Sequence, residues 1–223
     1  MIRLQHVSKV FGAGPSRVAA LSGISFNISK GEFAVLTGAS GAGKTTLLRM
    51  LYRAETPSDG DIEVAGFDVT ALRHSEVPRL RRSIGVVFQD SKLLAGRSVF
   101  ENVAFVLRVL GVARRDITPR AFAALKAVGL SARAQAFPHQ LSQGEAQRAS
   151  LARAIVKSPG LLLADEPTGN LDEEMAAEII GLVKDIWSRG TTVVFATHQA
   201  RLVPQLKRRT LRLEGGRLVK DEG

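Results

Sequence analysis

The sequence contains no cysteine, and its 223 residues include a single tryptophan and a single tyrosine. The absence of cysteine excludes a disulfide scaffold, a zinc–thiolate site and a thiol nucleophile. Aromatic residues make up 5% of the chain, and we find neither the aromatic signature of RNA-binding domains nor a DNA-reading motif. A nucleic-acid partner is therefore unsupported.

Long apolar runs are absent as well. A membrane-spanning helix needs about 18 or more apolar residues in succession, and no segment approaches that length. The N-terminal residues MIRLQHVSK lack the apolar segment of a signal peptide. We therefore expect a cytoplasmic protein without a membrane span. With 45% hydrophobic residues, the chain can still bury a full core without disulfides.

Positive charge is in excess, with a formal net charge of +10. Basic residues gather at positions 79–82, at Arg114 and Arg115, and at positions 207–209. Such a balance could serve nucleic acid, an anionic membrane surface or a bound polyphosphate. Each cluster taken alone is also explained by a solvated basic surface, so the composition does not choose among these partners.

The most informative segment is GASGAGKT, which matches the phosphate-binding pattern G-x-x-x-x-G-K-[ST]. An apolar run at 33–36 precedes it as a buried strand, and residues 46–49 follow as the start of a helix. Glycine lets backbone N–H groups converge on a polyphosphate, and the helix N-terminus adds partial positive charge. The pattern assigns Lys44 to the β- and γ-phosphates and the Thr45 hydroxyl to Mg²⁺. The predicted phosphate-binding residues are Gly38, Ala39, Ser40, Gly41, Ala42, Gly43, Lys44, Thr45 and Thr46.

A second constellation is the apolar strand Leu161–Ala164, which ends in two carboxylates and a proline. Held rigidly by a buried strand, Asp165 would lie near Thr45 and support the Mg²⁺ shell. Glu166 points elsewhere and could polarise the attacking water as a general base. A strand that merely ends in an acidic turn is the alternative, and the upstream phosphate loop argues against it.

A second candidate anion site lies at Ser142, which can cap a helix running to about Val156. Glu145 stands three residues on, the spacing of a capping box. A well-capped helix is one interpretation, and an anion site made by the exposed N–H groups and the Ser142 hydroxyl is the other. Because one triphosphate needs a single loop, a second phosphate-binding helix start favours a dimer.

The order of segments predicts an α/β fold. Short strands at 2–7, 24–28, 32–36 and 62–64 favour an antiparallel N-terminal part. Later strands at 84–88, 161–164 and 193–196 alternate with helices, which implies parallel crossovers. We expect a single domain, 1–223, with a mostly helical subdomain inserted at approximately 90–160.

Two helix starts and one hairpin belong to this expectation. Ser98 and Glu101 have the capping-box spacing. Pro119 suits the first turn of the next helix, which would run to about Val128 before Gly129 ends it. The pair Gly215-Gly216 is expected to close a final hairpin.

In combination, these motifs resemble the ATP-binding-cassette ATPases over nearly the whole chain. The resemblance implies a P-loop NTPase core, with a mixed sheet covered by helices on both faces, an N-terminal antiparallel β part and a helical subdomain. It implies ATP and Mg²⁺ as ligands, and a homodimer in the ATP-bound state. In that light Phe11 looks like the aromatic that stacks on adenine, and Gln89 like the glutamine that senses Mg²⁺ and water. His198 looks like the switch histidine, so the implied catalytic residues are Glu166, His198 and Gln89.

The resemblance also implies residues that act across the dimer. Ser142 and Gly144 are similar to the signature residues that contact the opposite γ-phosphate, within the segment Ser142, Gln143, Gly144 and Glu145. Gln143 departs from the family's usual glycine, which puts turnover or dimer affinity in doubt rather than the phosphate contacts. The loop Asn170, Leu171 and Asp172 resembles the one that crosses the interface, and the implied metal residues are Thr45, Gln89 and Asp165.

Within the family, the run from Glu76 to Asp90, with Arg97 and residues 102–104, resembles bacterial cell-division ATPases. This implies an integral membrane subunit resembling FtsX, control of cell-wall hydrolases, and a peripheral place on the inner face of the cell membrane. Related lipoprotein-release and macrolide-export ATPases share the segment 165–172, so a transporter subunit is one alternative. A nucleotide-gated scaffold with little hydrolysis is another, although Glu166 and His198 argue against it. Soluble ABC proteins of DNA repair or translation carry two cassettes or a long coiled coil, which this chain lacks.

Overall fold

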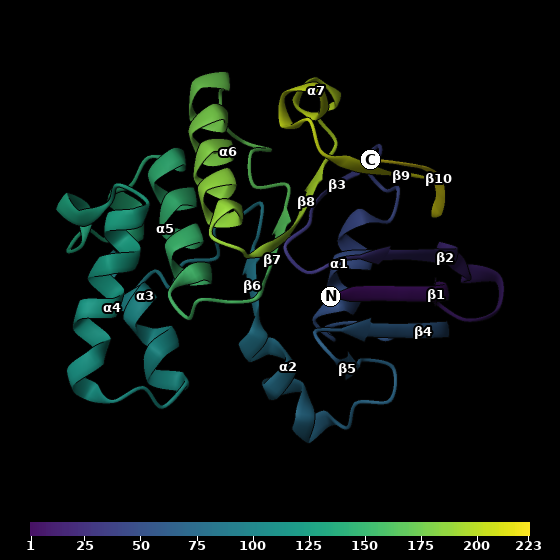
Figure 1. Cartoon of the computed structure of the whole chain (residues 1–223), viewed down its shortest axis with the longest axis horizontal. Coiled ribbons are helices and arrows are strands. Elements are labelled where there is room, and N and C mark those ends of the chain that lie inside the picture. The colour runs from purple at the N-terminus through teal and green to yellow at the C-terminus, as the bar shows by residue number, and fades with distance from the viewer.

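The computed structural model describes residues 1–223, except the side chain of Pro15. The strands are β1 (Ile2–Phe11), β2 (Val18–Ile28), β3 (Phe33–Thr37), β4 (Asp59–Val64), β5 (Phe67–Asp68), β6 (Ile84–Val87), β7 (Leu161–Asp165), β8 (Thr192–Thr197), β9 (Arg209–Glu214) and β10 (Arg217–Glu222). The α-helices are α1 (Lys44–Leu51), α2 (Val77–Ser83), α3 (Val99–Val109), α4 (Arg114–Ala127), α5 (Gln143–Ile155), α6 (Glu173–Ser188) and α7 (Val203–Leu206). Figure 1 shows their arrangement.

The N-terminal strands form an antiparallel sheet in the order β2-β1-β4-β5. Ile2 pairs with Ile28 on one side and with Val64 on the other. Alternate residues of β1 face the core at its start, so Ile2 and Leu4 are buried while Arg3 is exposed. The antiparallel part is thus as expected, but the segment predicted at 32–36 does not belong to it.

That segment is β3, and it lies inside the second sheet, whose order is β10-β9-β3-β8-β7-β6. β3 runs parallel to both β8 and β9, and its apolar residues are buried on both faces of the sheet, as is usual for parallel strands. The strands β6, β7 and β8 are also parallel to one another. β9 and β10 form the predicted final hairpin around Gly215 and Gly216, so the sheet is mixed.

Both faces of the mixed sheet are covered. On β8, Val193 and Phe195 pack into a hydrophobic cluster shared with α3, α4, α5 and α6. Val194 and Ala196 face the opposite way, into a cluster shared with α1 and the N-terminal sheet. Figure 1 shows α1 between the two sheets and α5 and α6 on the other side. The predicted α/β class with helices on both faces is confirmed.

The helices α3, α4 and α5 stand together at one end of the molecule (Figure 1). The Ser98 capping box at α3 forms as expected, with the Glu101 N–H donating to Ser98 Oγ at 3.2 Å. The prediction that Pro119 lies in the first turn of α4 is wrong. The helix begins at Arg114, five residues before Pro119, so the proline lies in the helix interior. There the proline removes one backbone donor, and the helix is stabilised by buried residues such as Ala121 and Leu125. The division into a core and an inserted subdomain stays a prediction.

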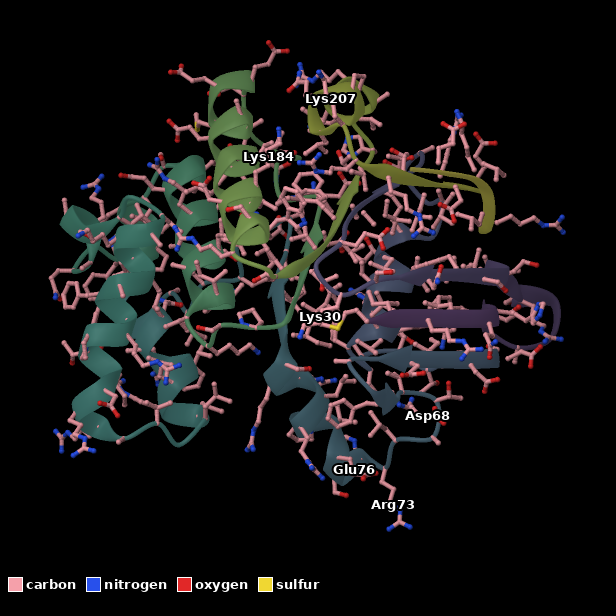
Figure 2. All side chains as sticks on the ribbon, viewed as in Figure 1. Lys30, Asp68, Arg73, Glu76, Lys184 and Lys207 are labelled. Carbon is pink, nitrogen blue, oxygen red and sulfur yellow. The ribbon has the colours of Figure 1, made fainter. Side chains whose placement is uncertain are left out.

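Polar side chains surround this core on every visible edge (Figure 2). At the turn before α2, the Arg73 N–H donates to Glu76 Oε2 at 3.0 Å. Lys184 extends from α6 toward α7 and donates to the Gln205 carbonyl at 3.2 Å. Within the described chain, no helix combines the length and apolarity that crossing a membrane requires.

Candidate functional site

The phosphate loop joins the end of β3 to the start of α1 and packs closely against neighbouring backbone. Gly38 and Gly43 have φ angles of +150° and +104°, values that favour glycine. A Cβ atom at Gly38 would lie 2.4 Å from the Leu213 carbonyl oxygen, and one at Gly43 would lie 2.7 Å from that of Ala20. Gly38 and Gly43 are therefore required by packing as well as by the approach of a phosphate.

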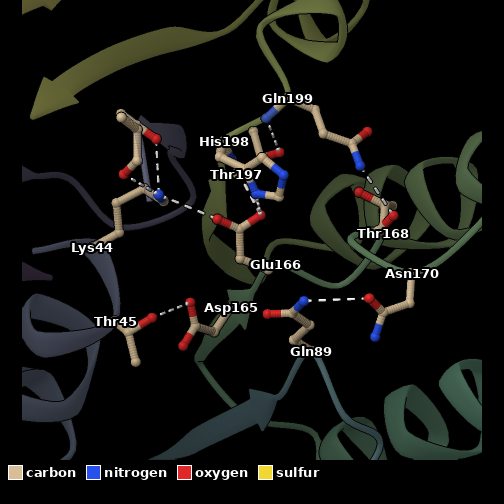
Figure 3. A network of polar contacts seen from close by, with 12 residues as sticks. Lys44, Thr45, Gln89, Asp165, Glu166, Thr168, Asn170, Thr197, His198 and Gln199 are labelled. Carbon is tan, nitrogen blue, oxygen red and sulfur yellow. Dashed lines mark hydrogen bonds and ion pairs between the residues drawn. The ribbon is translucent and has the colours of Figure 1, made fainter. Parts of the chain in front are cut away.

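Lys44 is nearly buried at the centre of a polar network, shown in Figure 3. Its ammonium donates to the carbonyls of Gly38 at 2.8 Å and Ala39 at 3.1 Å. It also forms an ion pair with Glu166, with 3.2 Å between Nζ and Oε1. The cation predicted to meet phosphate is thus held by its own loop and by the predicted general base.

Thr45 and Asp165 are in contact, as the sequence predicts. The Thr45 hydroxyl donates to Asp165 Oδ1 at 3.1 Å. Burial raises the pKa of the Asp165 carboxyl above its usual value, and the Glu166 charge adds to this, while Thr45, Lys44 and Arg49 act in the opposite direction. A cation at this carboxylate would relieve the cost of its buried charge.

Thr45 and Asp165 could hold a divalent cation only if a bound nucleotide and water supplied further oxygen ligands. Within residues 1–223 as described, no group of three or more His, Cys, Asp or Glu side chains could hold a metal. A hydroxyl and a carboxylate suit Mg²⁺, which binds proteins through few oxygens and takes the rest from phosphates and water. The metal-binding role of Thr45, Gln89 and Asp165 stays a prediction.

Glu166 has an uncommon backbone conformation, with φ of +51°. Its N–H donates to the Ala196 carbonyl at 3.0 Å, and its Oε2 accepts from the His198 N–H at 3.1 Å. The same oxygen lies 2.6 Å from His198 Nδ1. A left-handed conformation in a non-glycine residue costs on the order of 1 kcal/mol, and such strain concentrates at functional sites. The structure therefore brings the predicted catalytic pair Glu166 and His198 into direct contact.

Gln89 follows β6 and lies beside Asn170, with 3.4 Å between Gln89 Nε2 and Asn170 Oδ1. The surrounding loop is held by α5 in a way the sequence analysis missed. Gln147 donates to the Phe88 carbonyl at 2.9 Å. The Arg153 guanidinium donates to the carbonyls of Ser91 at 2.7 Å and Lys92 at 2.6 Å. These partners lie about 60 residues apart, so no local signal could have revealed them.

Ser142 caps α5 as predicted, through a complete capping box with Glu145. Arg133 adds two hydrogen bonds to the Glu145 carboxylate, at 2.8 Å and 3.4 Å. The Arg133 guanidinium and the Ser142 N–H lower the pKa of Glu145 to about 2. In the described chain, the hydrogen bonds of Ser142 involve Glu145 and Ala146, and none reaches the phosphate loop of the same chain.

The rest of the predicted signature and interface residues surround this helix start. Gln143 lines a cavity of about 240 Å³ together with Gln89 and Asn170. Gly144 is buried against Met175, whose Sδ would lie 2.7 Å from a Cβ at that position. Asp172 caps α6 by accepting from the Met175 N–H at 2.9 Å, and Leu171 packs against the core.

Phe11 stands apart from these groups, at the end of β1, with 38% of its surface exposed. A cleft of about 770 Å³ opens beside the phosphate loop, between residues 37–42 and His198 on one side and β9 and β10 on the other. Phe11 does not line this cleft, so adenine stacking at Phe11 stays a prediction.

Comparison with known proteins places this geometry in a family. The family profile described as ABC transporter matches residues 21–169, two thirds of the chain. The chain belongs to the ABC transporter family. This cassette is 48% identical over 218 residues to the cell division ATP-binding protein FtsE of Escherichia coli (strain K12), covering 98% of the chain and 97% of that protein. It is 46% identical over 222 residues to FtsE of Bacillus subtilis (strain 168), covering 100% and 96%.

Solved structures agree with the sequence relatives. A dimeric post-hydrolysis state of the ATP-binding cassette MJ0796, bound to ADP and Pi, has a TM-score of 0.90 at 32% identity and covers 100% of this chain and 98% of that one. A second dimeric structure of MJ0796, a bacterial ABC transporter cassette, has a TM-score of 0.90 at 33% identity with the same coverage. The cassette is therefore an FtsE-like, ATP-binding ABC ATPase.

Proposed function

We propose that the cassette hydrolyses ATP at the phosphate loop, with Glu166 as the general base. The observation that carries this is the line of contacts from Lys44 through Glu166 to His198. The water oxygen attacks the γ-phosphorus, and the bond from that phosphorus to the β–γ bridging oxygen breaks. Glu166 accepts a proton of the water, and ADP leaves with the bridging oxygen.

The other residues position and neutralise charge. Lys44 exchanges its loop carbonyls for the β- and γ-phosphate oxygens, and His198 Nδ1 keeps the Glu166 carboxylate oriented toward the water. Thr45 and Asp165, with Gln89, would hold Mg²⁺, which supplies neutralisation of the phosphate charge when bound. Phe11 would stack on the adenine base from the end of β1.

We further propose that two copies form an ATP-bound sandwich. Ser142 is exposed, and in the described chain it makes no hydrogen bond with its own phosphate loop. Placed against a second copy, Ser142 and Gly144 would complete the γ-phosphate site of the partner, and the loop 170–172 would cross the interface. The two dimeric relatives support this arrangement.

Glu166→Gln tests the sandwich, because it removes the base while keeping the shape of the side chain. With ATP and Mg²⁺, the variant should bind nucleotide, lose turnover and accumulate as a dimer in light scattering. Asp185→Asn, on the exposed side of α6, serves as a matched control and should behave like the native chain. A Glu166 variant that stays monomeric at high concentration with ATP bound would overturn the sandwich.

The partner proposed for this dimer is an integral membrane subunit resembling FtsX, in cell division and the control of cell-wall hydrolases. The relatives are named cell division ATP-binding protein FtsE, and this name supports a role in cell division. A groove of about 520 Å³ supports the contact, with an apolar floor at Ile84, Val86 and Val106. Its cations are Arg81, Lys92, Arg153 and Lys157, and within the described chain no acidic residue lines it.

The segment 93–100 does not line this groove. Val99 is completely buried in the core, and Phe100 packs on Phe122 with 5.1 Å between ring centroids. Burial lowers the pKa of Lys157 to about 8 and lowers that of Arg153. Because these desolvated cations lack acidic partners, the groove favours a cytoplasmic helix that carries acidic residues.

Recovery of the partner from membranes distinguishes this role from its closest alternative. Affinity capture of the full chain should retrieve an FtsX-like subunit, with the cassette at the inner face of the cell membrane. Retrieval of a lipoprotein-release or macrolide-type permease instead would replace cell division by transport. A captured cassette that binds ATP but never turns it over would favour the scaffold.

A further inference from the structure

Lys9 is a buried cation outside the phosphate site, with 9% of its surface exposed. It lies on β1, two residues before Phe11. Its ammonium donates to the Thr56 carbonyl at 2.8 Å and pairs with Glu55 Oε2 at 3.2 Å. It also lies 4.7 Å from the centroid of the Phe11 ring. A buried ammonium needs such partners, so its position is tightly defined.

The segment that holds Lys9 is itself fixed to the helix of the phosphate loop. The N–H groups of Ala54 and Glu55 donate to the Arg49 carbonyl at 2.8 Å and 3.3 Å. Arg49 belongs to α1, the helix that begins with Lys44. Lys9 therefore joins the strand end that carries Phe11 to the helix that carries the phosphate-binding residues.

The contact also decides which face of the ring is available. With the ammonium over one face, only the opposite face of Phe11 can stack on a base. We infer that Lys9 is a positioning residue, which orients Phe11 for the adenine base and fixes its place relative to Lys44. The inference rests on the adenine contact proposed above for Phe11, and it adds a cation that acts through the ring rather than on the nucleotide.

The test compares two ligands that share phosphates but differ in the base. Lys9→Met keeps most of the apolar stem and removes the charge, whereas Lys9→Arg keeps a cation. Calorimetric titration of the full chain with ADP and with inorganic tripolyphosphate gives two dissociation constants for each variant. We expect Lys9→Met to weaken ADP binding roughly threefold to tenfold, the range of a cation–π contact. The dissociation constant for tripolyphosphate should stay within about twofold of the native value. Lys9→Arg should restore ADP binding, and the exposed Lys30→Met is the matched control.

The outcomes separate the inference from the proposed function. An equal loss for ADP and tripolyphosphate would overturn it, because Lys9 would then only support the phosphate-loop helix. The inference would also be overturned if Lys9→Met left the ratio of the ADP and tripolyphosphate dissociation constants unchanged while Phe11→Ala weakened ADP binding alone. The adenine contact would then remain intact. If Phe11→Ala binds both ligands like the native chain, the adenine contact fails and the role of Lys9 fails with it. Thermal unfolding of each variant establishes that it is folded.

Discussion

Glu166 and His198 form the contact on which the proposed chemistry depends most. We predict that His198→Ala keeps ATP affinity within a few-fold but lowers turnover by roughly 10²-fold or more, because positioned proton transfer contributes about 10²–10⁴ in rate. Phosphate release and equilibrium ATP binding, measured on the same preparation, check this. His74→Ala, at an exposed site, is the control. Full turnover in His198→Ala would remove the histidine from the mechanism.

Asp165 leads to a prediction about pH. Because burial raises its pKa, the carboxyl takes up a proton at a higher pH than an ordinary aspartate, whose value is 3.8. The protonated form cannot bind Mg²⁺, so Mg²⁺-dependent ATP binding should weaken as the pH falls toward the raised pKa. Binding titrations at a series of pH values from neutral downward should show this dependence in the native chain. Asp165→Asn should bind weakly throughout and lack the dependence.

At this scale the sequence predicts what is local. The glycines and Lys44 form one continuous motif, and Asp165 and Glu166 end one apolar strand, so spacing alone indicates their places. The bond from Lys9 to the Thr56 carbonyl and the bonds from Arg153 to the carbonyls of Ser91 and Lys92 arise only when distant segments meet. The left-handed backbone of Glu166 accompanies a hydrogen bond to Ala196, thirty residues along the chain, which no local pattern encodes.

Among the elements, the start of α5 depends on an ionised carboxylate. The pKa of Glu145 is lowered to about 2 from a usual 4.5, so its stabilising effect is present above pH 4.5 and is lost as the pH falls through 2. We predict that Glu145→Gln destabilises the chain at neutral pH and that the difference from the native chain shrinks toward pH 3. Chemical denaturation at a series of pH values checks this. A difference that stays constant with pH would contradict it.

The loop before α3 is organised by the fully buried Asn102. Its amide donates to the carbonyls of Leu94, Arg97 and Ser98 and accepts from the Leu94 N–H at 2.7 Å. We predict that Asn102→Ala lowers the free energy of unfolding by about 2–4 kcal/mol, because several buried backbone groups lose their partners. Urea denaturation measures the change, with the exposed Asn170→Ala as control. A loss below about 1 kcal/mol would mean that water replaces the amide.

Element boundaries show where local rules stop. Both capping boxes were predictable, because Ser98 and Ser142 bond to residues three positions away. The prediction that Pro119 marks the first turn of α4 was wrong, because burial of the apolar face of α4 stabilises the helix by more than the backbone bond that proline removes. The segment at 32–36 was misplaced because its length does not distinguish an antiparallel from a parallel strand. Its partners β8 and β9 lie far along the chain.

For the whole molecule, the excess of positive charge bears on the membrane partner. We predict that Lys92→Glu, in the basic groove, weakens capture of the membrane subunit while leaving ATP binding unchanged, and that added salt weakens the native contact. Co-sedimentation with membranes that contain the subunit measures both effects. Lys126→Glu, on α4 and outside the groove, is the matched control. Equal loss in both variants would indicate general attraction to the membrane instead of docking in the groove.

The helix α5 connects two surfaces that have been described separately. Ser142 caps its N-terminus, Arg153 lies in its last turn, and the chain then leads to Lys157 in the groove. Its thirteen residues form a rod about 20 Å long, which packs on α3, α4 and α6. If the proposed membrane subunit tilts α5 at the groove, the Ser142 end, which is proposed to face the second copy, moves in the opposite direction. In the proposed assembly α5 is therefore a lever, whose arm is set by the number of turns in the helix.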